Sequence, residues 1–135
     1  MTFTQALFSF EGRINRLAYF GYGAALVLIM AVGVAVCAST LNTDAVALGV
    51  VVGAASFIMF CWGGYALAAK RFHDIGYTAK YLWACAFVAL ASTSLATAAP
   101  ALSIILNLIN IGASLFLLFT PGEKGSNQYG ADPLT

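Results

Sequence analysis

The chain has 135 residues, of which 61% are hydrophobic and 8% are charged, and its formal net charge is +1. Because a soluble domain carries about 25% charged residues, this composition excludes an ordinary water-exposed fold and predicts a single domain in a lipid bilayer. The near-neutral charge, with no basic stripe along the chain, argues against a nucleic-acid partner.

The first twelve residues predict a short amphipathic helix that lies in the membrane interface, and the alternative is an unstructured tail. Thr2 and Gln5 have the spacing of a capping box, in which each side chain bonds to the backbone of the other. Apolar residues then recur at helical spacing and form one stripe: Phe3, Leu7, Phe10 and Ile14. Gly12 suits the end of this helix, because glycine readily adopts the left-handed conformation that follows a helix.

Four apolar runs predict membrane-spanning helices, because about 20 residues rising about 1.5 Å each cross about 30 Å of hydrocarbon. They cover residues 17–38, 45–69, 81–99 and 101–119. A polar loop, residues 70–80, separates the second run from the third, and a tail over residues 120–135 follows the fourth. Short turns make consecutive helices antiparallel neighbours. The predicted fold is therefore an all-α bundle of four transmembrane helices with a short N-terminal interfacial helix.

In this arrangement all basic residues fall on one side of the membrane. They are Arg13, Arg16, Lys70, Arg71, Lys80 and Lys124. Because cytoplasmic loops are enriched in lysine and arginine, the positive-inside rule places both termini and the central loop in the cytoplasm. The predicted topology is multi-pass, with the two short turns on the opposite side.

Three polar stretches then stand on the predicted cytoplasmic face. They are FEGRINR at residues 10–16, KRFHDIG at residues 70–76 and PGEKGSNQYGADP at residues 121–133. In this order and spacing the chain resembles the DUF-805 family, small bacterial inner-membrane proteins of unknown function. The resemblance covers nearly the whole chain and implies the fold above and a location in the bacterial inner (plasma) membrane. It implies no reaction, because the family has none assigned.

The resemblance carries over specific positions of the three motifs. They are Phe10, Gly12, Arg13, Arg16, Arg71, His73, Asp74, Gly76, Pro121, Gly122, Gly125, Asn127, Tyr129, Gly130, Asp132 and Pro133. The chain departs from the family pattern at Lys70, where arginine is usual, and at Tyr81–Leu82, where a tryptophan pair is common. The first departure keeps the charge, whereas the second weakens any argument for a particular aromatic anchor.

We expect the three stretches to form one cytoplasmic cluster centred on Asp74, the acid in a loop that also carries three cations. Asp74 is predicted to pair with Arg13 or Arg16, with arginine favoured because its guanidinium group binds a carboxylate through two hydrogen bonds. The cluster comprises Arg13, Arg16, Arg71, His73, Asp74, Asn127, Tyr129 and Asp132.

This cluster allows three interpretations. It can tie the loop to the N-terminal arginines, or it can bind an anionic lipid headgroup or phosphate, which arginine suits. His73 and Asp74 can also form a proton-transfer pair, since histidine titrates near neutral pH. Adjacent residues point in different directions and no nucleophile is evident, so the sequence argues against an enzyme.

The predicted fourth helix carries polar residues on one face: Ser103, Asn107, Asn110 and Ser114. An unsatisfied polar group in hydrocarbon costs several kcal/mol, so this face must meet protein or water. We expect Asn107 and Asn110 to face other helices of the chain through hydrogen bonds. The alternative is a small polar pathway, although the predicted spans lack the mid-membrane ionisable residue that ion or proton couplers usually have.

The sequence thus favours a non-enzymatic membrane protein that acts as a scaffold, or binds a lipid or partner, through its cytoplasmic cluster. The alternative function is a small transporter or channel that uses the polar face of the fourth helix. Candidate partners are membrane lipids with anionic headgroups, a second copy of the chain, or another protein. Three cysteines in apolar runs lack metal-ligand spacing, and neither a metal nor a cofactor is expected.

Overall fold

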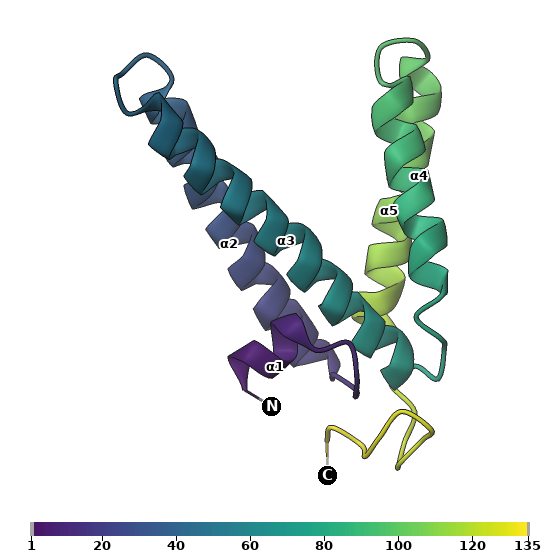
Figure 1. Ribbon diagram of the computed structural model, residues 1–135. Coiled ribbons are helices and arrows are strands. Elements are labelled where there is room, and N and C mark those ends of the chain that lie inside the picture. Colours follow the sequence, from purple (N-terminus) through teal and green to yellow (C-terminus); the bar gives the residue numbers. More distant parts are fainter. Residues whose placement is uncertain (1, 135) are drawn as a thin grey trace. The chain divides into compact units, whose positions relative to one another are not determined.

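The computed structural model describes residues 2–134 and contains five α-helices in that range, without a β-strand (Figure 1). The helices are α1 (Phe3–Phe8), α2 (Arg16–Thr40), α3 (Val46–Asp74), α4 (Tyr81–Leu95) and α5 (Pro100–Phe119). The prediction of an all-α fold is therefore confirmed.

Three helices, α2, α3 and α5, are long and apolar enough to cross a membrane, as expected of a membrane protein. The fourth, α4, is apolar but has only 15 residues, because it ends at Leu95 and not at Ala99 as predicted. Pro100 explains part of this difference, since a proline pushes the preceding residue out of the helical region. Ala99 accordingly has φ −145° and ψ 69°, and Pro100 opens α5. The bundle of four spans stays a prediction.

The predicted loop 70–80 is wrong over its first half, because α3 continues to Asp74. The helix ends in a Schellman motif, in which Tyr77 N donates to Phe72 O at 2.8 Å and Gly76 N donates to His73 O at 3.2 Å. Gly76 has φ 88°, the left-handed conformation that this motif requires. The polar residues at positions 70–74 therefore lie on helix faces, and Lys70 is buried.

The chain divides into two compact units, one with residues 2–10 and 17–67 and the other with residues 11–16 and 68–134. In the first unit, α2 and the first part of α3 pack closely through small residues. A Cβ atom on Gly33 would overlap Ser56, and one on Gly53 would lie 3.1 Å from the Cβ of Cys37. Glycine at these positions therefore allows the two helices to approach each other closely.

The N-terminal helix α1 belongs to the first unit. The predicted capping box is confirmed, with Gln5 N donating to Thr2 Oγ1 and Thr2 N donating to Gln5 Oε1. The helix ends at Phe8 and not at Gly12, because the backbone is already extended at Ser9. Leu7 is buried beside Gly63 of α3. The location of α1 in a membrane interface stays a prediction.

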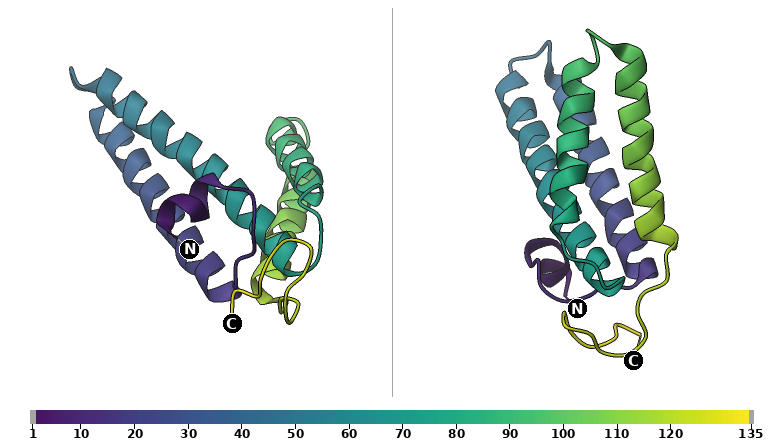
Figure 2. Two further views of the ribbon diagram at one scale, coloured as in Figure 1. Left: turned by 60° about the horizontal axis from the view of Figure 1, so that its bottom comes forward. Right: turned by 90° about the vertical axis from the view of Figure 1, so that its right-hand side faces the viewer.

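The second unit contains the end of α3, the α4–α5 hairpin, residues 11–16 and the C-terminal tail. Helices α4 and α5 lie side by side and antiparallel, joined by a tight turn (Figure 2). Ser92 of α4 and Ser103 of α5 are buried between them, and Ser92 Oγ donates to Ser103 O at 3.2 Å. After α5 the tail folds back as a compact loop. The polar stretches predicted from the sequence meet in this unit.

Candidate functional site

Asp74 lies between two arginine side chains at the end of α3. Nε and Nη2 of Arg13 each lie 3.1 Å from Oδ1 of Asp74, and Nη1 of Arg71 forms an ion pair with Oδ2. The exposed fractions of these residues are 2% for Asp74, 4% for Arg13 and 0% for Arg71. The predicted ion pair is therefore present, and Arg13 rather than Arg16 makes it. Arg71, whose sequence position marked it only as a cluster member, is the second partner.

Arg71 also binds the C-terminal end of α5. Its Nε donates to Leu117 O at 2.7 Å, and its Nη2 donates to Thr120 O. The exposed Arg16 donates from Nη1 to Phe119 O at 3.3 Å. The last carbonyl groups of a helix have no partner within the helix and carry partial negative charge, so two cations are well placed there. Arg16 thus caps a helix instead of joining the ion pair with Asp74.

Arg13 attaches the tail to the end of α3. Its Nη1 donates to Gly125 O at 2.6 Å, its Nη2 donates to Glu123 O, and Glu123 N donates to Asp74 O at 2.8 Å. Gly122 lies against the Asp74 carboxylate so closely that a Cβ atom there would overlap it. The tail therefore approaches the ion pair through backbone atoms. The identities of the tail side chains do not predict this contact.

A second set of contacts holds the tail through His73. The imidazole ring stacks on Tyr129 with centroids 4.0 Å apart and an angle of 6° between planes. Nδ1 lies 3.2 Å from Gly12 O and donates to it, because a carbonyl oxygen can only accept. Asn127 Nδ2 donates to His73 O at 2.9 Å and to Glu123 Oε2 at 2.8 Å. The predicted cluster members His73, Asn127 and Tyr129 thus lie together.

Asp132 closes the tail loop. Its Oδ1 accepts from Leu134 N at 3.0 Å and its Oδ2 accepts from Gly125 N at 2.9 Å. These backbone hydrogen bonds lower the pKa of Asp132, and the positive charge of Arg13 adds to the effect. Asp132 therefore stabilises the loop whose carbonyl groups Arg13 binds.

We refer to Arg13, Arg71, His73, Asp74, Asn127 and Tyr129 as the polar cluster. Every buried side-chain nitrogen and oxygen within residues 2–134 has a hydrogen-bond partner. The charged groups of the polar cluster bind each other and the carbonyl groups of the same chain. These bonds are structural, because the two arginine side chains share the carboxylate of Asp74.

Two of the four polar residues on the predicted face of α5 contact α4, and the other two are exposed. Ser103 contacts α4. Asn110 also contacts α4: in the amide orientation that satisfies both neighbours, its nitrogen donates to Cys85 O at 3.2 Å and its oxygen accepts from Ala89 N at 3.3 Å. Asn107 is exposed and donates to Ser103 O of its own helix at 3.1 Å. Ser114 is likewise exposed and donates to Asn110 O at 2.9 Å. Asn107 therefore departs from the prediction, because bonding to the preceding turn satisfies a polar side chain without a partner helix.

Comparison with known proteins identifies one sequence family. Residues 7–131 match the family described as "Protein of unknown function (DUF805)". The matched range includes the polar cluster and all five helices except the first residues of α1. No curated protein and no solved structure matches the chain. The resemblance seen in the three polar stretches is thereby confirmed.

Proposed function

We propose that this chain, which belongs to the DUF805 family of proteins of unknown function, is a non-enzymatic scaffold of the bacterial inner membrane that presents a fixed C-terminal tail to a protein partner. In this proposal both termini lie in the cytoplasm. In the predicted four-span arrangement all six Lys and Arg residues fall on the same side as the termini, and cytoplasmic segments are enriched in these residues. The observation that supports it most is the buried ion pair of Asp74 with Arg13 and Arg71.

The bonding of the polar cluster favours a structural role over catalysis. Both carboxylate oxygens of Asp74 are occupied by guanidinium groups, and the ring of His73 is covered by Tyr129. A general acid or base must be within hydrogen-bond reach of a substrate proton. Asp74 instead binds the chain itself through both carboxylate oxygens, and His73 does so through Nδ1, which helps to hold the tail in one conformation.

The tail presents a polar surface around its anchored residue. Asn127 is bound to His73 O, whereas the side chains on either side of it are exposed: Glu123, Lys124, Ser126 and Gln128. Two of these residues carry opposite charges, and a fixed loop loses less conformational entropy on binding than a flexible one. This surface suits a protein partner that reads a small loop of defined shape.

Cysteine labelling tests the proposed topology. In a variant whose native cysteines, at positions 37, 61 and 85, are replaced, a cysteine at Asn42 is expected to react with a membrane-impermeant maleimide from outside the cell. Cysteines at Tyr77 and Ser126 should react only after permeabilisation, because the basic side of the chain faces the cytoplasm. Labelling of Tyr77→Cys in intact cells would contradict the assignment.

Photocrosslinking tests the scaffold role. A photoreactive amino acid at Gln128, which is exposed on the tail, is expected to give one protein adduct of defined mass in native membranes. Asn127→Ala should reduce that adduct, because it removes the bonds to His73 O and Glu123 that fix the loop. The matched control places the crosslinker at the exposed Asn42. The same adduct from Asn42, or no effect of Asn127→Ala, would count against a fixed, partner-binding tail.

A further inference from the structure

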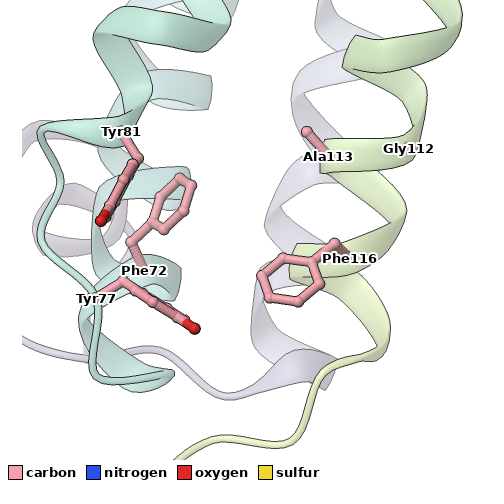
Figure 3. Close-up of a pocket in the computed structure, with 6 residues that line it drawn as sticks. All are labelled: Phe72, Tyr77, Tyr81, Gly112, Ala113 and Phe116. Atoms are coloured by element: carbon pink, nitrogen blue, oxygen red, sulfur yellow. The ribbon is translucent and has the colours of Figure 1, made fainter.

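An apolar groove of about 450 Å³ lies within the second unit, and the polar cluster does not line it. Figure 3 shows aromatic rings from the end of α3 and the start of α4 on one side and α5 on the other. Its lining consists of Phe72, Tyr77, Tyr81, Gly112, Ala113 and Phe116. The volume is within the range of ligand sites, about 300–1,000 Å³.

The aromatic side of the groove is pre-formed. Tyr81 stacks on Phe72 with centroids 6.1 Å apart and meets Tyr77 edge-on at 5.8 Å. The Schellman motif that ends α3 fixes Phe72 and Tyr77 relative to each other, because it joins their backbones by a hydrogen bond. A ligand that enters therefore meets rings that are already ordered, which reduces the entropy lost on binding.

The opposite side of the groove is open because α5 carries small residues there. A Cβ atom added to Gly112 would meet no other atom within 4 Å. Glycine weakens a helix interior by about 1 kcal/mol relative to alanine, so its use at this position leaves room at some cost to helix stability. The free space beside Gly112 and Ala113 is thus apolar.

Two exposed cations close to residues of the groove lining suggest what occupies the groove. Lys80, which is exposed, directly precedes Tyr81, and the exposed Arg16 binds Phe119 O, about one turn beyond Phe116. Neither cation is part of the ion pair with Asp74. Because α5 is apolar enough to cross a membrane, an apolar groove beside it suits a hydrocarbon chain, and the two cations are adjacent in sequence or by contact to residues near its lining. Basic residues beside a membrane helix attract anionic headgroups.

We propose that this groove binds one acyl chain of an anionic phospholipid, with the headgroup at Lys80 and Arg16. The apolar lining accepts the chain, the missing side chain of Gly112 makes room for it, and the two exposed cations select the negative headgroup. The site is separate from the tail surface, so this proposal does not depend on the scaffold role.

Native mass spectrometry of the purified chain tests the proposal, with phosphatidylglycerol and phosphatidylcholine of identical acyl chains as probes. The wild type is expected to retain one phosphatidylglycerol. Gly112→Leu should weaken this binding about tenfold or more, because its side chain takes the space of several methylene groups that lose their burial. Gly21→Leu is the matched control, since Gly21 also lies in an apolar helix with open space around it, and should bind as the wild type does.

Three further measurements separate the contribution of the acyl chain from that of the headgroup. Lys80→Gln should reduce the preference for phosphatidylglycerol over phosphatidylcholine, and glycerol phosphate, which has no acyl chain, should give no adduct. A photoreactive group on the acyl chain should label residues 72–81 and 112–116. Wild-type phosphatidylglycerol binding by Gly112→Leu, binding of glycerol phosphate alone, or labelling confined to other residues would each overturn the assignment.

Discussion

Replacing Asp74 with alanine is expected to lower the free energy of unfolding by about 3–5 kcal/mol, the cost of leaving a buried charge without its partner. The two guanidinium groups that would lose their shared anion, those of Arg13 and Arg71, are buried. The tail would also be held less firmly, because Arg13, which pairs with Asp74, donates hydrogen bonds to the carbonyl groups of Glu123 and Gly125 in the tail. Unfolding of the purified chain in mixed micelles, followed by tryptophan fluorescence, measures the change.

A double-mutant cycle identifies the partner of Asp74. Asp74→Ala and Arg13→Gln should be strongly non-additive, because each removes the other's counter-ion. Arg16→Gln is the matched control: Arg16 is an exposed arginine that binds Phe119 O, and its loss should cost about 1 kcal/mol or less. Its effect should add to that of Asp74→Ala. Equal coupling to both arginines, or an Asp74→Ala variant as stable as the wild type, would contradict the observed pairing.

Gly122→Ala is expected to cost about 1–3 kcal/mol, the range for overpacking a well-packed site. The added methyl group would overlap the carboxylate of Asp74. This carboxylate cannot rotate away cheaply, because Arg13 holds one oxygen and Arg71 holds the other. The tail must therefore move, and the hydrogen bond from Glu123 N to Asp74 O would lengthen. The same unfolding measurement gives the change in free energy.

Replacing Gly122 in both the wild type and Asp74→Ala distinguishes overlap with the carboxylate from a general effect on the tail. In Asp74→Ala, the added methyl group at position 122 meets no carboxylate, so most of its cost should disappear. Gly21→Ala, in open space on α2, should be neutral or stabilising by up to about 1 kcal/mol, since alanine favours a helix. An identical penalty for Gly122→Ala in both backgrounds would mean that contact with Asp74 is not the reason for glycine there.

Several features of the fold follow from short-range patterns that a sequence reader can evaluate. The capping box of Thr2 and Gln5 depends on residues three apart, and the fourth apolar run, predicted over residues 101–119, matches α5 to within one residue. The pairing of Asp74 with an arginine follows from charge, because an acid among cations near a membrane needs a partner. These predictions succeed because the interactions that decide them involve neighbours in sequence or simple charge compensation.

The boundary of α3 was not predictable in the same way. Lys70 and Arg71 read as loop residues, yet both are buried in a continuing helix. Their burial is possible because long-range partners compensate it, such as Leu117 O for Arg71, 46 residues away. The choice between Arg13 and Arg16 as partner of Asp74 likewise depends on a long-range contact, because Arg13 and Asp74 are 61 residues apart in sequence.

By itself the sequence determined that the chain is helical and apolar, that three stretches of it are polar, and that Asp74 would find an arginine. The tertiary structure alone decided that this arginine is Arg13, that Arg71 joins it, and that the tail meets both through backbone carbonyl groups. The physical reason is that every residue carries a carbonyl group, so side-chain identity does not distinguish one acceptor from another. Only the folded path of the chain brings particular carbonyl groups within reach of a buried guanidinium group.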